Sequence, residues 1–196
     1  MNGLTTLENK LVLAFPDAMN ADAFYRFSRA NPNLRMELNS NGEVEIMAGT
    51  GGKTGLIENI INRRIGNWNE QTGLGVSFSP STGFRLKNGS VRLSDGAWMR
   101  LDRWNALSPD DQERFPPAPD FVVEVRSPSD DLNALKSKMD EWMQNGVALA
   151  WLIDPDAQTA YIYRQNGERL IVKGFHHSLS GEDVLPEFEL RLGDLR

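Results

Sequence analysis

Residues 119–130 read PDFVVEVRSPSD, and the apolar run at their centre is typical of a buried β-strand. The side chains of a strand alternate between its two faces, so Glu124 and Arg126 share one face with Val122. A buried carboxylate costs several kcal/mol unless it is paired or binds a metal ion. The strand therefore carries either a structural Glu124–Arg126 ion pair or part of a functional site.

The next two segments predict a helix and a second buried strand. Residues 131–146 place an apolar stripe that includes Met139 and Trp142 on one helical face, and they close with Asn-Gly. Residues 147–154 read VALAWLID, an uninterrupted apolar run of the kind found in strands covered on both faces. A strand–helix–strand unit of this type indicates a sheet with helices packed against it.

Hairpins and two further helices surround this unit. Residues 20–31 and 54–73 have the apolar spacing of helices, with Asn20 as the cap of the first and Gly73 as the end of the second. Asn-Gly pairs favour tight hairpin turns, and they occur at residues 41–42, 88–89 and 166–167.

The chain has 196 residues and a mass of 22.0 kDa, enough for one domain with a substantial core. We predict a mixed α/β (α+β) fold in which helices flank a mixed β-sheet, with residues 1–21 as an N-terminal arm and 22–196 as a single domain. No apolar stretch approaches the roughly 20 residues of a membrane helix, and no secretory signal is recognisable. We therefore expect a cytoplasmic protein without a membrane segment.

The formal net charge is −6 and the pI is near 5.0. Proteins that bind nucleic acid mainly by neutralising phosphates are usually basic, so this balance argues against broad, tight nucleic-acid binding. It is compatible with a local basic groove, or with an acidic site that attracts phosphate once a metal ion is bound.

The chain has no cysteine and only two histidines, His176 and His177. This composition excludes disulfides, zinc–thiolate sites and cysteine nucleophiles. Neighbouring residues of a strand point to opposite faces, so we interpret the histidines as a solvated loop pair rather than a shared metal site. Metal chemistry would then use oxygen ligands, which favours Mg²⁺ or Mn²⁺ over zinc.

Asp95 and Glu37 are further acids in strand-like segments. Asp95 interrupts the segment VRLSDGAWM on the face that should be apolar, where it could form a metal site with an acid from a neighbouring strand. Because Asp-Gly often marks a break in a strand, Asp95 is equally explained as a bulge or turn residue. Glu37, in the segment RMELN, is more simply explained as an exposed charge on a hairpin.

Three lysines could serve such a site. Lys136 and Lys138 lie on opposite edges of the apolar stripe of their helix, so helical periodicity does not decide which of them reaches the strand. Lys53 lies in MAGTGGKTG, which superficially looks like a phosphate-binding loop. That motif requires glycine where Met47 stands, so we interpret the segment as a flexible or substrate-contacting loop in which Lys53 could touch a phosphate.

Several segments follow one another in a recognisable order: RMEL…NGEVEIM, LSDGAWM, PDFVVEVRSPSD, KMDEWMQNGVALAWLIDP and LSGEDVLPEFEL. This order resembles the Uma family of predicted restriction endonucleases, which is assigned to the PD-(D/E)XK nuclease superfamily. The resemblance extends from about Asp22 to Leu192, and VVEVRSPSD with GVALAWLIDP downstream is its most specific part. It implies a restriction-endonuclease-like sheet flanked by helices, and a protein that is often a homodimer.

The resemblance also implies an active site. Asp95 matches the strand aspartate of the superfamily, and Glu124 matches its second acid. Glu37 matches an acid that recurs in a YEL-like segment of the family, which makes it an accessory candidate.

The match to the motif is less direct for the cationic residue of that site. Arg126 stands where the motif has a lysine, and arginine stays protonated, so it could stabilise phosphate charge but could not act as a base. Many family members use a lysine of the following helix instead. Lys138 matches that lysine, which favours it over Lys136.

We therefore expect metal-dependent hydrolysis of a nucleic-acid phosphodiester, with DNA as the substrate. Asp95 and Glu124, with the backbone carbonyl of Val125, would hold one or two Mg²⁺ (or Mn²⁺) ions. Lys138 would orient the attacking water, and Arg126 would offset charge in the transition state. The alternative is a catalytically inactive nuclease fold that serves as a binding or assembly module, which the acidic pI favours.

Overall fold

The computed structural model describes residues 4–7 and 10–195, with side chains from residue 10 onward. The chain divides into two compact units that are each assembled from separate segments. Unit 1 comprises the residues up to 49 together with 81–93 and 107–118, and unit 2 comprises 50–80, 94–106 and 119 onward. The boundary predicted between residues 21 and 22 stays a prediction.

Unit 1 is built around an antiparallel sheet. Its strands are β1 (Leu4–Leu7), β2 (Lys10–Leu13), β3 (Arg35–Leu38), β4 (Val44–Met47), β6 (Gly83–Arg85) and β7 (Val91–Leu93), in the order β1-β2-β4-β3-β7-β6. Its helices are α1 (Ala21–Ala30) and α4 (Pro109–Glu113). Asn20 caps α1 as predicted, because its Oδ1 accepts a hydrogen bond from the Ala23 amide at 2.9 Å. Phe24 of α1 packs in a small core with Met36, Leu38, Val44 and Val91.

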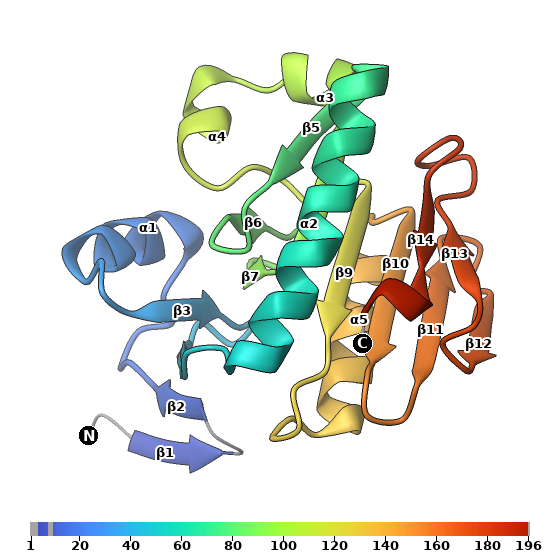
Figure 1. Cartoon of the computed structure of the whole chain (residues 1–196). Coiled ribbons are helices and arrows are strands. Elements are labelled where there is room, and N and C mark those ends of the chain that lie inside the picture. Colours follow the sequence, from blue (N-terminus) through green and yellow to red (C-terminus); the bar gives the residue numbers. More distant parts are fainter. Residues whose placement is uncertain (1–3, 8–9, 196) are drawn as a thin grey trace. The chain divides into compact units, whose positions relative to one another are not determined.

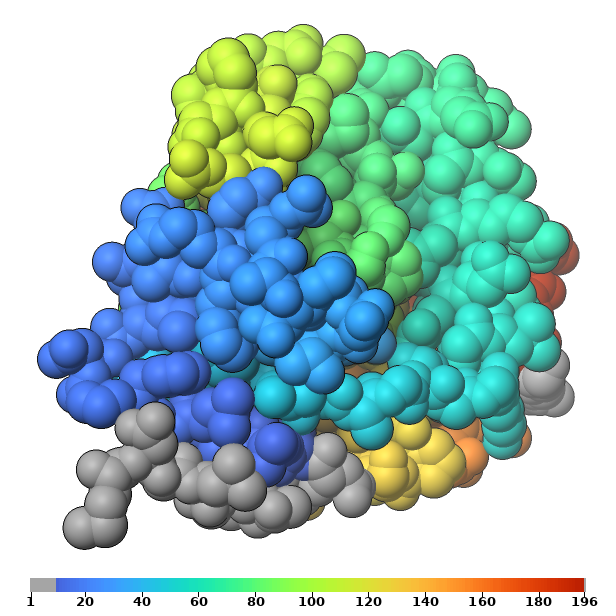
Figure 2. All heavy atoms as spheres, turned by 90° about the vertical axis from the view of Figure 1, so that its left-hand side faces the viewer, coloured from blue at the N-terminus to red at the C-terminus, as the bar shows by residue number. Residues whose placement is uncertain are grey.

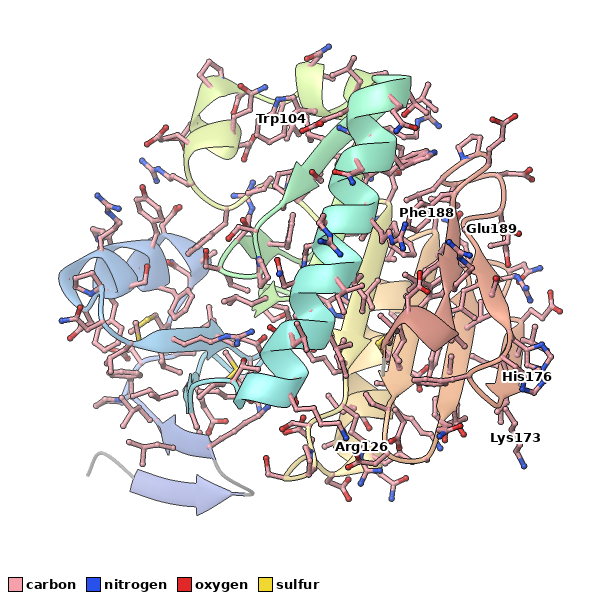
Figure 3. All side chains as sticks on the ribbon, in the orientation of Figure 1. Trp104, Arg126, Lys173, His176, Phe188 and Glu189 are labelled. Atoms are coloured by element: carbon pink, nitrogen blue, oxygen red, sulfur yellow. The ribbon has the colours of Figure 1, made fainter. Side chains whose placement is uncertain are left out.

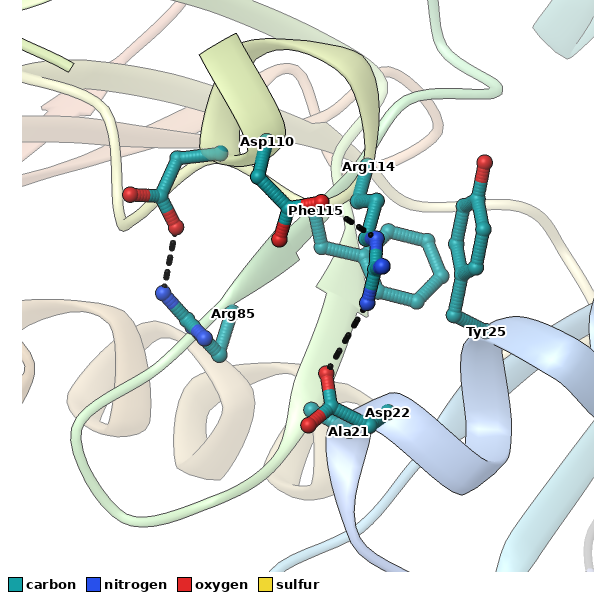
Figure 4. Close-up of a pocket in the computed structure, with 8 residues that line it drawn as sticks. Ala21, Asp22, Tyr25, Arg85, Asp110, Arg114 and Phe115 are labelled. Atoms are coloured by element: carbon teal, nitrogen blue, oxygen red, sulfur yellow. Dashed lines mark hydrogen bonds and ion pairs between the residues drawn. The ribbon is translucent and has the colours of Figure 1, made fainter. Parts of the chain in front are cut away.

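A cluster of ion pairs ties α1 to α4 (Figure 4). Arg114 pairs with Asp22 at 3.5 Å and with Asp110 at 2.9 Å. Arg85 pairs with Asp111 of α4 at 2.6 Å. In Figure 2 the yellow-green surface of α4 lies directly against the blue surface of α1. The cluster encloses only about 10 Å³, which is the space of one water molecule, so we interpret it as a structural clamp.

Unit 2 is a mixed sheet with helices on both faces (Figure 1). Its strands are β5 (Gly75–Phe78), β8 (Gly96–Arg100), β9 (Phe121–Val125), β10 (Leu149–Asp154), β11 (Thr159–Arg164) and β12 (Arg169–Lys173), in the order β12-β11-β10-β9-β8-β5. Its remaining elements are α2 (Gly52–Thr72), α3 (Leu101–Asn105), α5 (Leu132–Gln144), the small sheet of β13 (Ser178–Ser180) with β14 (Glu189–Arg191), and a 3₁₀ helix (Leu192–Leu195). This architecture confirms the predicted mixed sheet flanked by helices.

The predicted strand–helix–strand unit is β9–α5–β10. The two strands are parallel neighbours, and every side chain of both is buried. α2 packs against β5, β8 and β9, whereas α5 packs against β10 and β11 from the other face (Figure 1). Apolar side chains on both faces explain why these strands occupy the centre of the sheet.

The predicted ends and turns agree with the structure. α2 ends at Gly73, whose φ of 64° is the left-handed conformation of a helix C-cap. Each predicted hairpin turn has a glycine with positive φ, at Gly42, Gly89 and Gly167. None of the helices in the described part of the chain is long and apolar enough to cross a membrane.

Gly75, at the start of β5, provides a test of this packing. A Cβ at this position would collide with the Met99 carbonyl oxygen and the Trp98 indole, and a backbone atom cannot swing away. We expect Gly75→Ala to lower the free energy of unfolding by about 1–3 kcal/mol, measured by urea denaturation.

Gly66→Ala is the matched control, because a Cβ there meets nothing within 4 Å. In the interior of α2 this change should raise the free energy of unfolding by about 1 kcal/mol. Equal effects of the two substitutions would contradict the close approach of β5 to β8.

Candidate active site

Asp95 lies where the chain enters the sheet of unit 2. Its amide donates to the Val123 carbonyl at 3.0 Å, and Gly96 is the residue opposite Val123 in the register of β8 with β9. Two consecutive residues therefore face one residue of β9, as in a β-bulge. The segment VRLSDGAWM is thus divided: its first part is β7 of unit 1 and its last part is β8 of unit 2.

The Asp95 carboxylate extends the pairing of β8 with β9. Its Oδ2 accepts a hydrogen bond from the Val125 amide at 2.8 Å, and the residue is only 9% exposed. From α2, the Asn62 side chain donates to the Asp95 carbonyl at 2.6 Å. The acid is therefore held on both its backbone and its side chain, next to the residue that follows Glu124.

Glu124 is buried between β9 and α5. It is 3% exposed, and the Lys138 ammonium lies 3.1 Å from Oε1 and 3.2 Å from Oε2. The Trp142 indole Nε1 donates to Oε1 at 2.9 Å. A buried carboxylate is thus compensated by one positive charge and one neutral donor, both from α5.

A hydrogen bond joins Asp95 to the strand that carries Glu124. The register of β8 with β9 ends at the bulge, where Gly96 lies opposite Val123, and Asp95 Oδ2 then accepts from the amide of Val125, the residue after Glu124. Asp95, which is distant from Glu124 in the sequence, therefore lies beside the end of β9.

Arg126 pairs with Asp154 and Glu124 pairs with Lys138, whereas the sequence had allowed a Glu124–Arg126 ion pair. The Arg126 guanidinium donates to Asp154 Oδ2 at 2.7 Å and to the Asp130 carbonyl at 3.2 Å. Asp154 is 1% exposed, and its hydrogen bond raises the pKa of Arg126. Figure 3 shows Arg126 where β9 leaves the sheet. The arginine therefore joins the ends of β9 and β10 and the loop that leads to α5.

The other two lysines have separate contacts. The Lys136 ammonium lies 4.7 Å from the centre of the Tyr161 ring, on β11. Lys53, near the start of α2, is exposed and pairs with Asp156 at 3.4 Å. The structure therefore brings Lys138, rather than Lys136, to Glu124.

Glu37 lies in unit 1, on β3, and the explanation as an exposed hairpin charge is wrong. It is 0% exposed, and its carboxylate pairs with Arg92 at 3.0 Å and accepts from the Leu93 amide at 3.0 Å. Arg92 also pairs with Glu45, the residue opposite Glu37 on β4, at 3.1 Å. Its accessory role in catalysis stays a prediction.

His176 and His177 are exposed and lie in a turn, in agreement with their interpretation as a solvated loop pair (Figure 3 labels His176). Their ring centres are 4.0 Å apart. The alternation of strand side chains therefore does not apply to them.

Sequence reasoning missed three further polar residues of this region. Trp142 was assigned only to the apolar stripe, and Asp154 only to the end of a buried strand. Glu58 is 9% exposed on α2, one turn before Asn62, which also donates to its carbonyl at 2.8 Å. A polar residue next to an apolar helical stripe was the available signal for Glu58, but such residues are usually solvated.

Comparison with known proteins identifies the family to which the chain belongs. A family model with the description "Putative restriction endonuclease" matches residues 21–193. The chain belongs to this family, Uma2. The resemblance inferred from the motifs is thereby confirmed, and membership indicates a nuclease. A search of curated proteins finds no match.

A solved structure shares the fold of this Uma2 chain. It is the crystal structure of "a putative nuclease belonging to DUF820" from Anabaena variabilis ATCC 29413. The TM-score is 0.75 at 19% sequence identity, and the match covers 90% of this chain and 97% of the other. At this identity the likeness establishes the fold.

Asp95, Glu124 and Val125 carry the kind of oxygen donors that a hard divalent cation prefers. Asp95 and Glu124 supply carboxylate oxygens, and the Val125 carbonyl faces β8 because its own N–H bonds to Asp95. Within residues 4–7 and 10–195, no group of three His, Cys, Asp or Glu residues is arranged to hold a metal ion. Two carboxylates with a backbone carbonyl and water would suit Mg²⁺, which usually keeps several waters.

Arg126→Gln tests the interaction with Asp154. The substitution would leave a buried carboxylate without its guanidinium, so we expect the free energy of unfolding to fall by about 2–4 kcal/mol in urea denaturation. Adding Asp154→Asn to the same chain should recover part of this loss.

Arg191→Gln is the control, because Arg191 is 70% exposed and lies 3.8 Å from Asp194. Such surface pairs contribute about 0–1 kcal/mol. If Arg126→Gln had as small an effect as this control, Asp154 would not be what holds Arg126.

Proposed function

We propose that this Uma2 protein is a Mg²⁺- or Mn²⁺-dependent endonuclease that hydrolyses phosphodiester bonds of DNA. The proposal is supported by two buried acids beside β9: Asp95 is bonded to the amide that follows Glu124, and Glu124 is paired with Lys138. Buried acids beside a lysine at the end of a strand fit the pattern of a metal-assisted phosphodiesterase. Family membership supports the nuclease chemistry, and the metal and the DNA substrate belong to the proposal.

Asp95, Glu124 and the Val125 carbonyl would hold the ion. A bound divalent ion lowers the pKa of water and polarises the phosphoryl oxygens. Asp95 is suited to the role because hydrogen bonds from Val125 and Asn62 already fix its carboxylate and its backbone. It would therefore lose little conformational entropy on binding an ion.

The cationic side chains would act on the substrate. Lys138, 16% exposed, would orient the attacking water from α5, while Arg126, 28% exposed, would offset charge on the phosphate. Arg126 is anchored by Asp154, so its role would be electrostatic and it would not move a proton. Lys53, on the exposed start of α2, is a candidate phosphate contact. Glu37 stays an accessory candidate, and the homodimer and the cytoplasmic location stay predictions.

Asp95→Asn and Glu124→Gln test the proposal directly. Each removes one charged ligand and should reduce Mg²⁺- or Mn²⁺-dependent cleavage of DNA by about a thousandfold, because several kcal/mol of transition-state stabilisation is lost. The measurement is cleavage of linear, supercoiled and single-stranded DNA with each metal and with EDTA.

Glu189→Gln is the control, since Glu189 is exposed on β14 (Figure 3). It should cleave at the wild-type rate. Cleavage that survived in both acid variants would show that the chemistry lies elsewhere.

The alternative function is a binding or assembly module without catalysis. One observation favours it: both oxygens of Glu124 already contact Lys138, and Trp142 contacts Oε1 as well. In that case the wild-type protein should show no Mg²⁺ or Mn²⁺ affinity by calorimetry, and Glu124→Gln should raise the stability at neutral pH. Stabilisation by metal that disappears in Glu124→Gln would exclude this alternative.

A further inference from the structure

α5 presents two donors to the same carboxylate. Lys138 and Trp142 are four residues apart, so they lie on one face of the helix, over Glu124. The indole donates to Oε1 at 2.9 Å, and the ammonium lies within 3.2 Å of both oxygens. One helix face therefore sets the position of this acid.

The two donors differ in what they do to the carboxylate. Trp142 is 0% exposed and is held by the packing of the core, so its N–H has a fixed direction. An indole N–H uses one of about four lone-pair sites and leaves the negative charge in place. The Lys138 side chain is 16% exposed and brings a full positive charge that a cation at Glu124 must oppose.

We propose that Trp142 is a positioning residue of the site: its indole N–H holds Oε1 of Glu124 and thereby orients the carboxylate for a divalent cation. Lys138 acts in the opposite sense, as a built-in counter-ion that weakens cation binding while serving the reaction. This inference rests on the proposed function, because it assigns Glu124 to the metal. Such outer hydrogen bonds to metal ligands commonly change metal affinity by about 10–100-fold.

The chain offers a matched control in Trp98. It is 1% exposed, and its indole Nε1 donates to Asn69 Oδ1 at 2.7 Å, so it is as buried and as well bonded as Trp142. Its partner is a neutral amide of α2 rather than a carboxylate of the site. Trp142→Phe and Trp98→Phe therefore remove the same buried N–H donor, but the first takes it from the Glu124 carboxylate and the second from the Asn69 amide.

The experiment is Mn²⁺ binding to the full chain by calorimetry, with cleavage of DNA measured in parallel. Trp142→Phe should bind Mn²⁺ about tenfold more weakly than the wild type. Trp98→Phe should keep the wild-type affinity although both variants lose stability. Lys138→Met should bind Mn²⁺ about fivefold more tightly and yet cleave poorly.

A second measurement needs no tryptophan substitution. In wild-type protein labelled with ¹⁵N at the indoles, added Mn²⁺ should broaden the Trp142 resonance at lower concentration than the Trp98 resonance. Glu124→Gln should shift the Trp142 resonance and abolish its selective broadening.

The outcomes separate the two proposals. Equal Mn²⁺ affinities of Trp142→Phe and Trp98→Phe, with the wild type binding Mn²⁺ and cleaving DNA, would overturn the positioning role and leave the nuclease proposal standing. Weaker binding by Lys138→Met would overturn the counter-ion role. A wild-type chain without Mn²⁺ affinity would overturn the proposed function and the inference together.

Discussion

The burial of two carboxylates beside β9, those of Asp95 and Glu124, is the constraint on which this region depends. Each would be costly if it were buried without donors or opposite charge. Asp95 meets this demand through the Val125 amide, and Glu124 meets it through the ammonium and indole of α5. The entry of β8 into the sheet and the docking of α5 are therefore coupled to the same two acids.

The connection from β9 through α5 to β10 supplies this arrangement. Parallel neighbours require a crossover, and the helix in that crossover must lie on one face of the sheet. Glu124 points to that face, so a lysine 14 residues later reaches it. Arg126 and Asp154 join the ends of the two strands, which fixes the loop from which α5 begins.

Local features of the chain were predictable because neighbouring residues determine them. Asn20, Gly73 and the Asn-Gly turns act through the backbone within a few residues, and all of them lie where the sequence placed them. The division of VRLSDGAWM between β7 and β8 was not predictable, because a strand has the same alternation whichever sheet it joins. The Asp-Gly signal marked the break without indicating that it separates two sheets.

The sequence alone determined the class of fold, the alternation that places Glu124 and Arg126 on one face, and the family. Only the tertiary structure decided which partner each charge meets. Helical periodicity placed Lys136 and Lys138 symmetrically about the apolar stripe. The strands beneath the helix distinguish them, because Lys138 contacts Glu124 of β9 and Lys136 lies over the Tyr161 ring of β11. In the same way, Glu37 was interpreted from its pattern as an exposed hairpin charge, but it is fully buried against Arg92. A charged residue's local sequence does not encode its burial, because burial depends on which distant segments pack over it.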